Sequence, residues 1–163
     1  MRINHALLLA APCVVSAAVL AWAQSPKGGL YEVTSHMTWQ QSPFPAGMQA
    51  PAGAGGPHST QVCVTQTQIE KYNGPKPDAS GGCHVTNIQK HEGGMTAEIV
   101  CDSQMKGKGT VETTWTDSGH SKSKVHFTGS MQMGPNSKKI EWTVESISTY
   151  KGPACGAVKP LAD

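Results

Sequence analysis

Apolar and polar residues alternate along most of the chain, as they do in β-strands that have one buried face and one wet face. The clearest block runs from residue 83 to residue 150. Residues 83–101 read as two strands folded about a Glu-Gly-Gly turn, and three further alternating runs follow at 109–116, 123–133 and 139–150. Short turns separate these runs, so the block predicts an antiparallel meander.

Two more strands are predicted before this block, at 30–40 and 59–66. Thr65 or Thr67 can accept backbone N–H bonds and so cap a short helical turn that ends near residue 72. Residues 41–57 are rich in Pro, Gly and Ala, and we expect a flexible loop there. Its two large apolar side chains either fold back over the sheet or form a flap at a ligand mouth; they are Phe44 and Met48.

About seven strands with one apolar face must curl or double over to hide that face. We therefore predict an all-β fold: an antiparallel meander that forms a strongly curved sheet or a partly closed barrel, with one short helical turn. A two-layer sandwich is the alternative. Gly109 and Gly129 lie inside strands and are the expected bend points.

The first 23 residues resemble an export signal. A positive start at Met1-Arg2 precedes an apolar run over 6–20, and the small-x-small pattern of 21–23 is typical of signal-peptidase cleavage after Ala23. The run is short for a membrane-spanning helix, which needs about 20 residues. We expect residues 1–23 to be removed, leaving 24–163 as a single periplasmic or secreted domain without a membrane span.

Four cysteines lie beyond this leader, and an even count in an oxidising compartment predicts two disulfides. Three pairings are possible. A hairpin loop at 91–93 would place Cys83 opposite Cys101, so geometry favours a Cys83–Cys101 bridge and leaves Cys63 with Cys155. A four-thiolate zinc site is the alternative, but the sequence has no C-x-x-C pair.

Several motifs occur in a distinctive order along the chain. These are G-L-Y-E-V-T at 29–34, V-C-V-T at 62–65, the cysteine-bounded hairpin, G-S-M-x-M at 129–133 and Cys-Gly at 155–156. Together they resemble DUF3617, a bacterial family of exported domains of unknown function. The resemblance implies a periplasmic or surface-associated β domain with two bridges, and it implies no activity and no catalytic residue. Residues 157–163 extend past the last cysteine, which the family usually has near the chain end.

Composition and motifs argue against several function classes. The net charge is +2 and the only arginine is Arg2, so a nucleic-acid partner is not expected. The nucleophile motif G-x-S-x-G does not occur, and the strand glutamates fall on polar faces. We therefore expect a monomeric, non-enzymatic protein without a cofactor.

Three functions remain. The preferred one is binding of an apolar small molecule, or of an envelope protein, by a partly closed barrel whose candidate pocket is lined by Tyr31, Trp39, Trp115, Phe127 and Trp142. The second is handling of Cu(I), for which thioethers and imidazole are suitable ligands, with Met131, Met133 and His36 as candidates; core packing is the other interpretation of these methionines. The third is inhibition of a secreted hydrolase.

Overall fold

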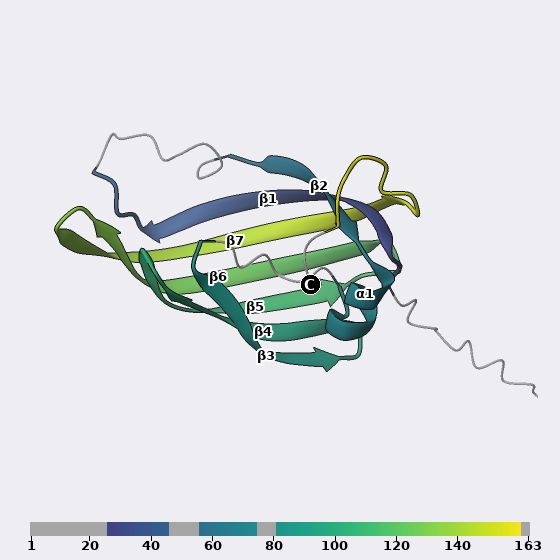
Figure 1. The fold of residues 1–163 in the computed structure, drawn as a ribbon, viewed down its shortest axis with the longest axis horizontal. Helices are drawn as coiled ribbons and strands as arrows, with labels where there is room; N and C mark the ends of the chain where they lie inside the picture. Colours follow the sequence, from purple (N-terminus) through teal and green to yellow (C-terminus); the bar gives the residue numbers. More distant parts are fainter. Residues whose placement is uncertain (1–25, 46–55, 75–80, 161–163) are drawn as a thin grey trace, which may run out of the picture.

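The computed structural model describes residues 26–45, 56–74 and 81–160. The predicted signal peptide, its cleavage point after Ala23 and residues 46–55 of the predicted loop lie outside this part. The described elements are β1 (Gly29–Gln41), β2 (His58–Val64), α1 (Gln66–Tyr72), β3 (Cys83–His91), β4 (Gly94–Asp102), β5 (Met105–Trp115), β6 (His120–Met133) and β7 (Asn136–Gly152). Figure 1 shows the strands side by side, with α1 at one end of them.

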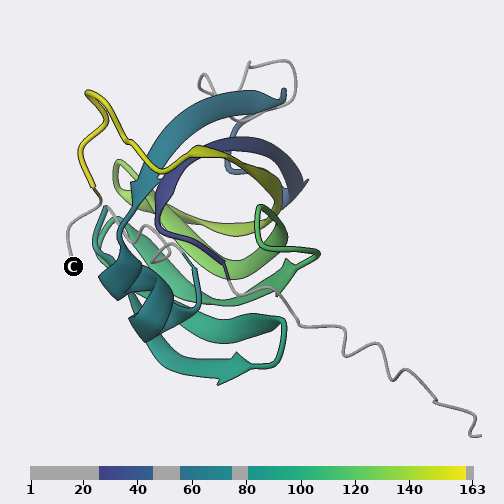
Figure 2. The same cartoon turned by 90° about the vertical axis from the view of Figure 1, so that its right-hand side faces the viewer.

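The strands form one antiparallel sheet in the order β2-β1-β7-β6-β5-β4-β3. Strands β3 to β7 form the predicted meander. The last of them, β7, pairs on its other side with β1, from Leu30 to Gln41. Because β2 and β3 are the two edges, the sheet curls without closing into a barrel (Figure 2). The prediction of a strongly curved all-β sheet with one short helix is confirmed, and all the described strands belong to this single sheet rather than to two layers.

The β3–β4 hairpin has a shorter loop than the sequence predicted. His91 pairs with Gly94, so only residues 92 and 93 form the loop, instead of 91–93. Gly93 has a φ of +76°, a conformation that glycine adopts without steric cost. The tight loop therefore depends on the second residue of the predicted Glu-Gly-Gly turn.

A β-bulge in β3 corrects the register of the same hairpin. Beyond the loop, a regular ladder would place Cys83 opposite Asp102. The register shifts between Thr86 and Gln89, where Asn87 has a φ of +51°, and Cys83 then lies opposite Cys101. A bulge inserts one extra residue into one strand. The predicted Cys83–Cys101 pairing is therefore present, but it needs this irregularity as well as the turn.

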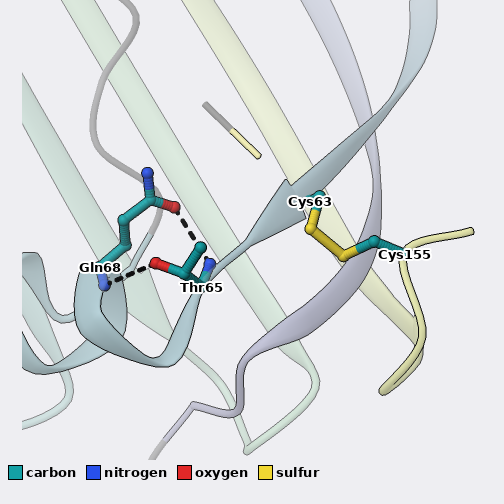
Figure 3. The surroundings of a disulfide bond; sticks show 4 residues. All are labelled: Cys63, Thr65, Gln68 and Cys155. Atoms are coloured by element: carbon teal, nitrogen blue, oxygen red, sulfur yellow. Dashed lines mark hydrogen bonds between the residues drawn. A yellow bond between two sulfur atoms is a disulfide. The ribbon is translucent and has the colours of Figure 1, made fainter. Parts of the chain in front are cut away.

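Both predicted bridges are present in the structure. Cys83 and Cys101 are joined with their Cα atoms 4.0 Å apart. Cys63, near the end of β2, is joined to Cys155, which follows β7, with a Cα–Cα distance of 5.5 Å (Figure 3). The second bridge spans 92 residues of sequence and fixes the C-terminal segment to the β2 edge.

Phe127 explains why glycines occupy the positions predicted as bend points. Its ring is completely buried and lies against Gly107, Gly109 and Gly129 of β5 and β6. A Cβ atom at Gly129 would overlap the carbonyl oxygen of Lys106 and lie 2.9 Å from the Cα atom of Gly107. Glycine is required here because the two backbones and the ring approach closely.

Helix α1 is held at both ends by side chains. The Thr65 hydroxyl accepts from the Gln68 N–H at 3.1 Å, and the Gln68 amide oxygen accepts from the Thr65 N–H at 3.1 Å (Figure 3). This reciprocal pair is a capping box, so Thr65 rather than Thr67 begins the helix. Asn73 ends it in the left-handed conformation, with a φ of +56°, and its side-chain amide donates to the carbonyl of Gly94 at 3.0 Å.

The core consists of two clusters on the inner face of the curled sheet. The buried members of the large cluster include Phe127, Met95, Ile140 and Tyr72. The buried members of the small cluster are Tyr31, Val64, Ile69 and Trp115. Since Ile69 and Tyr72 both belong to α1, the helix contributes to both clusters and links them at one end of the strands.

Candidate functional site

Two adjacent rows of side chains cross the middle of the inner face. Register places Ser35 of β1, Ser146 of β7 and Ser123 of β6 side by side, and it places Met37, Val144 and Val125 in the next row along the same strands. We call these six residues the inner platform. All six are half-buried. The platform therefore presents a hydroxyl row and an apolar row, both partly open to solvent.

The hydroxyl row continues into buried hydroxyls on neighbouring positions. Thr113 of β5 is buried and lies opposite Ser123, with their side-chain oxygens 2.9 Å apart. Ser121 and Ser148 are buried opposite each other one row further along. Thr113, Ser121 and Ser148 are therefore as fully buried as the members of the two apolar clusters.

One member of the apolar row packs against a core cluster, and the other two do not. Met37 and Val144 are not among the half-buried side chains that pack against either cluster, whereas Val125 packs against the large one. Trp39 and Trp142 form the row beyond them. Trp39 Nε1 is buried, and within the described residues it has no hydrogen-bond partner.

The five aromatic residues predicted to line one pocket lie in two groups. Tyr31 and Trp115 belong to the small cluster, with ring centroids 6.0 Å apart. Phe127 stacks on Trp142 at 5.2 Å in the large cluster, against which Trp39 also packs. The inner platform lies between the two groups, because residues 35 and 37 separate Tyr31 from Trp39 along β1. Sequence reasoning identified the two ends of the inner face and missed its middle.

Burial changes the electrostatics of the small cluster. The Tyr31 hydroxyl donates to the carbonyl of Lys27 at 2.6 Å. Desolvation by burial raises the pKa of Tyr31. This phenol is therefore neutral at physiological pH and acts as a structural donor.

The platform contains no hydroxyl that is hydrogen-bonded to a base among the described residues. His58 of β2 lies opposite Ser35, but His58 is exposed and no hydrogen bond joins the two side chains. Ser123 is paired with the Thr113 hydroxyl instead. A nucleophilic serine requires an adjacent general base, and none of the platform serines is hydrogen-bonded to one in the described part of the chain.

The outer face of the sheet carries the charges. Ion pairs join Lys124 to Glu145 at 3.5 Å and Lys151 to Glu32 at 3.2 Å. A cavity of about 510 Å³ lies between β1, β7, β6 and β5. Its lining consists mostly of outer-face residues, among them Ile147, which is 55% exposed, and it also includes Ser35, Ser123 and Ser146 of the hydroxyl row. None of the five predicted aromatic residues lines this cavity. Exposed ion pairs contribute little to stability, on the order of 0–1 kcal/mol.

A second electrostatic feature lies in the β5–β6 turn. Asp117 accepts from the Gly119 N–H at 2.7 Å and contacts the His120 ring at 2.8 Å. The Gly119 hydrogen bond, followed by the one from His120, lowers the pKa of Asp117. This turn is exposed, so the contacts order the loop rather than support the core.

The predicted copper ligands do not form one site. His36 lies on the outer face of β1, opposite Glu145, and lines the outer cavity. Met131 lies on the inner face near the far end of β6, with Met133 two residues further on. Within the described ranges, no group of three or more His, Cys, Asp or Glu side chains is placed to hold a metal ion.

A family model described as "Protein of unknown function (DUF3617)" matches residues 26–155. No curated protein and no solved structure matches the chain. Over the part of the chain that the structure describes, no helix has the length and apolar character needed to cross a membrane.

Proposed function

Because the chain belongs to the DUF3617 family, whose description assigns no activity, we propose its function from the inner platform: it is an exported, non-enzymatic domain that binds an apolar small molecule there. The observation that carries this proposal is the partly exposed apolar row of Met37, Val144 and Val125. Removing apolar surface from water is favourable by about 25 cal/mol per Å² of free energy. A ligand that covers this row recovers that free energy.

The cysteines support export. All four cysteines of the described part are joined in two bridges, and disulfides persist in oxidising compartments such as the periplasm. The apolar run and the small-x-small pattern before Gln24 support the same location. Intact mass spectrometry of protein from a native periplasm tests this proposal, with an expected species that begins at Gln24 and is lighter by four hydrogens. A species that retains Met1, or one with free thiols, would argue against export.

The binding proposal is tested with the neutral fluorescent probe N-phenyl-1-naphthylamine. We expect a saturable rise in probe fluorescence with the wild-type protein. Val144→Glu places a charge in the apolar row, where burying it under a ligand is costly, and it should weaken probe binding by roughly tenfold or more.

Thr143→Glu is the matched control, because it introduces the same charge next to Val144 on the same strand but on the outer face, and Thr143 does not line the cavity that the platform serines share. It should leave probe affinity unchanged. Circular dichroism and a melting curve establish that both variants fold. Equal weakening by both variants, or a wild-type signal that does not saturate, would count against the inner platform as a binding site.

A further inference from the structure

Strand register brings together three methionines that are distant in the sequence. Met105, the first residue of β5, lies directly opposite Met131 of β6. Met133 follows two residues later on β6, so its side chain points to the same face as that of Met131. All three are half-buried at one end of the inner face, next to the β6–β7 turn. The sequence alone does not reveal that Met105 belongs with the M-x-M pair.

The three side chains can reach one point. Directly opposed residues have Cβ atoms about 4.5–5.5 Å apart, and diagonal neighbours are about 7–8 Å apart. Methionine is unbranched and has three rotatable bonds beyond the backbone, so its sulfur adapts to irregular positions. Met105 opposes Met131 directly and Met133 diagonally. Three thioether sulfurs can therefore meet around one ion without movement of the strands.

We propose that Met105, Met131 and Met133 form a binding site for Cu(I). Soft thioether ligands select Cu(I) over harder ions such as Zn²⁺. Among the described residues no free thiolate competes for the ion, because all four cysteines there are joined in bridges. The site does not depend on the inner platform, since Val125 lies six residues, or about 20 Å, from Met131 along β6.

These methionines differ from an ordinary core methionine in the same protein. Met95 is 2% exposed and is a buried member of the large cluster. Met105 and Met131 only pack against the edge of that cluster and keep solvent access. A metal ion can reach the thioethers of Met105 and Met131, whereas it cannot reach that of Met95.

Silver(I) is the first probe, because it has the same d10 configuration and soft character as Cu(I) and is stable in air. Titration in chloride-free buffer, followed through ¹³C-labelled methionine methyl resonances, should show one equivalent bound and three shifted methyl signals. Met105→Leu, Met131→Leu and Met133→Leu should each weaken affinity at least about tenfold. Met95→Leu is the control, since it makes the same change in the buried core, and His36→Ala tests the imidazole that the sequence suggested; neither should alter affinity.

Cu(I) affinity is then measured in ascorbate by competition with bathocuproine disulfonate, which leaves the disulfides intact. Zn²⁺ should shift none of the three methyl signals. The proposal is overturned if wild type binds no Ag(I) equivalent, if Met95→Leu weakens binding as much as Met105→Leu, or if His36→Ala abolishes it. Melting curves of each variant separate lost ligands from lost folding.

Discussion

Replacing the indole of Trp115 tests how α1 is held against the sheet. Trp115 ends β5 and is 8% exposed, and its Nε1–H donates to the carbonyl of Asn73 at 2.6 Å. Asn73 is the residue that ends α1. Trp115→Phe keeps an aromatic ring in the small cluster, but it removes this donor and part of the ring.

The expected cost follows from two contributions. Leaving the Asn73 carbonyl without its partner costs about 1–3 kcal/mol. Reducing the size of a buried ring adds roughly 1 kcal/mol from lost contacts and residual space. We therefore expect Trp115→Phe to lower the free energy of unfolding by about 2–4 kcal/mol, which corresponds to a fall of roughly 10 °C in Tm for a domain of this size.

Trp39→Phe is the matched control, because it is the same chemical change at an indole whose buried Nε1 has no partner within the described residues. It removes an unpaired donor, so the hydrogen-bonding contribution should be neutral or stabilising and should offset the lost ring contacts. Urea denaturation of the oxidised proteins, followed by circular dichroism, gives both values. If Trp39→Phe costs as much as Trp115→Phe, the Trp115–Asn73 hydrogen bond is not what stabilises this end of the sheet.

Three further predictions concern the backbone, the bridges and the exposed turn. Gly129→Ala should destabilise the protein by about 1–3 kcal/mol in thermal melts, because its Cβ would overlap a neighbouring carbonyl, whereas Gly56→Ala, with open space around it, should have little effect. Replacing the two cysteines of a bridge by Ala should lower the free energy of unfolding by about 5 kcal/mol for Cys63–Cys155 and by about 3 kcal/mol for Cys83–Cys101, because the first bridge closes the longer loop. Equal losses in urea denaturation would contradict this dependence on loop length. The pKa of Asp117 is lower in the folded protein than its ordinary value of 3.8, so its contribution to stability is present above that value and is lost as the pH falls toward the folded-state pKa. NMR titration of the Asp117 carboxyl should give a midpoint below 3.8, and a midpoint at or above 3.8 would refute the contact. Asp117→Ala should also accelerate hydrogen exchange of the Gly119 amide proton, which the Asp117 carboxylate accepts in the wild-type protein.

Local features of the fold were predictable because each depends on residues close together in the sequence. Alternation identified all seven strands, and the start of α1 was narrowed to two candidate caps, Thr65 and Thr67, of which Thr65 is the N-cap. The last two strands are longer than the alternation indicated, at His120–Met133 and Asn136–Gly152. Strand β7 begins at Asn136 because only residues 134 and 135 separate it from β6. Pairing continues through polar residues wherever a tight turn holds two strands in register.

The inner platform was not predicted because three distant strands contribute to it. Its sequence signal is weak: Ser35 interrupts an apolar run between Val33 and Met37, and serines at 123 and 146 stand next to apolar positions in the same way. Each of these serines alone resembles an ordinary polar substitution. Only the pairing of β1 with β7, which the strand order establishes, shows that the three serines form one row. The same limitation hid the contact of Met105 with Met131.

The open edge of the sheet connects the fold to the proposed binding. Strand β2 has only seven residues and its pairing with β1 ends where Ser35 meets His58, so residues 36–41 of β1 have no strand partner on that side among the described residues. The other edge, β3, is interrupted by the bulge at Asn87. Short and bulged edges resist pairing with further strands. The sheet stays open between β2 and β3, and Met37 lies on β1 beside the part of that strand that β2 does not cover. We propose this opening as the route by which a ligand reaches the apolar row.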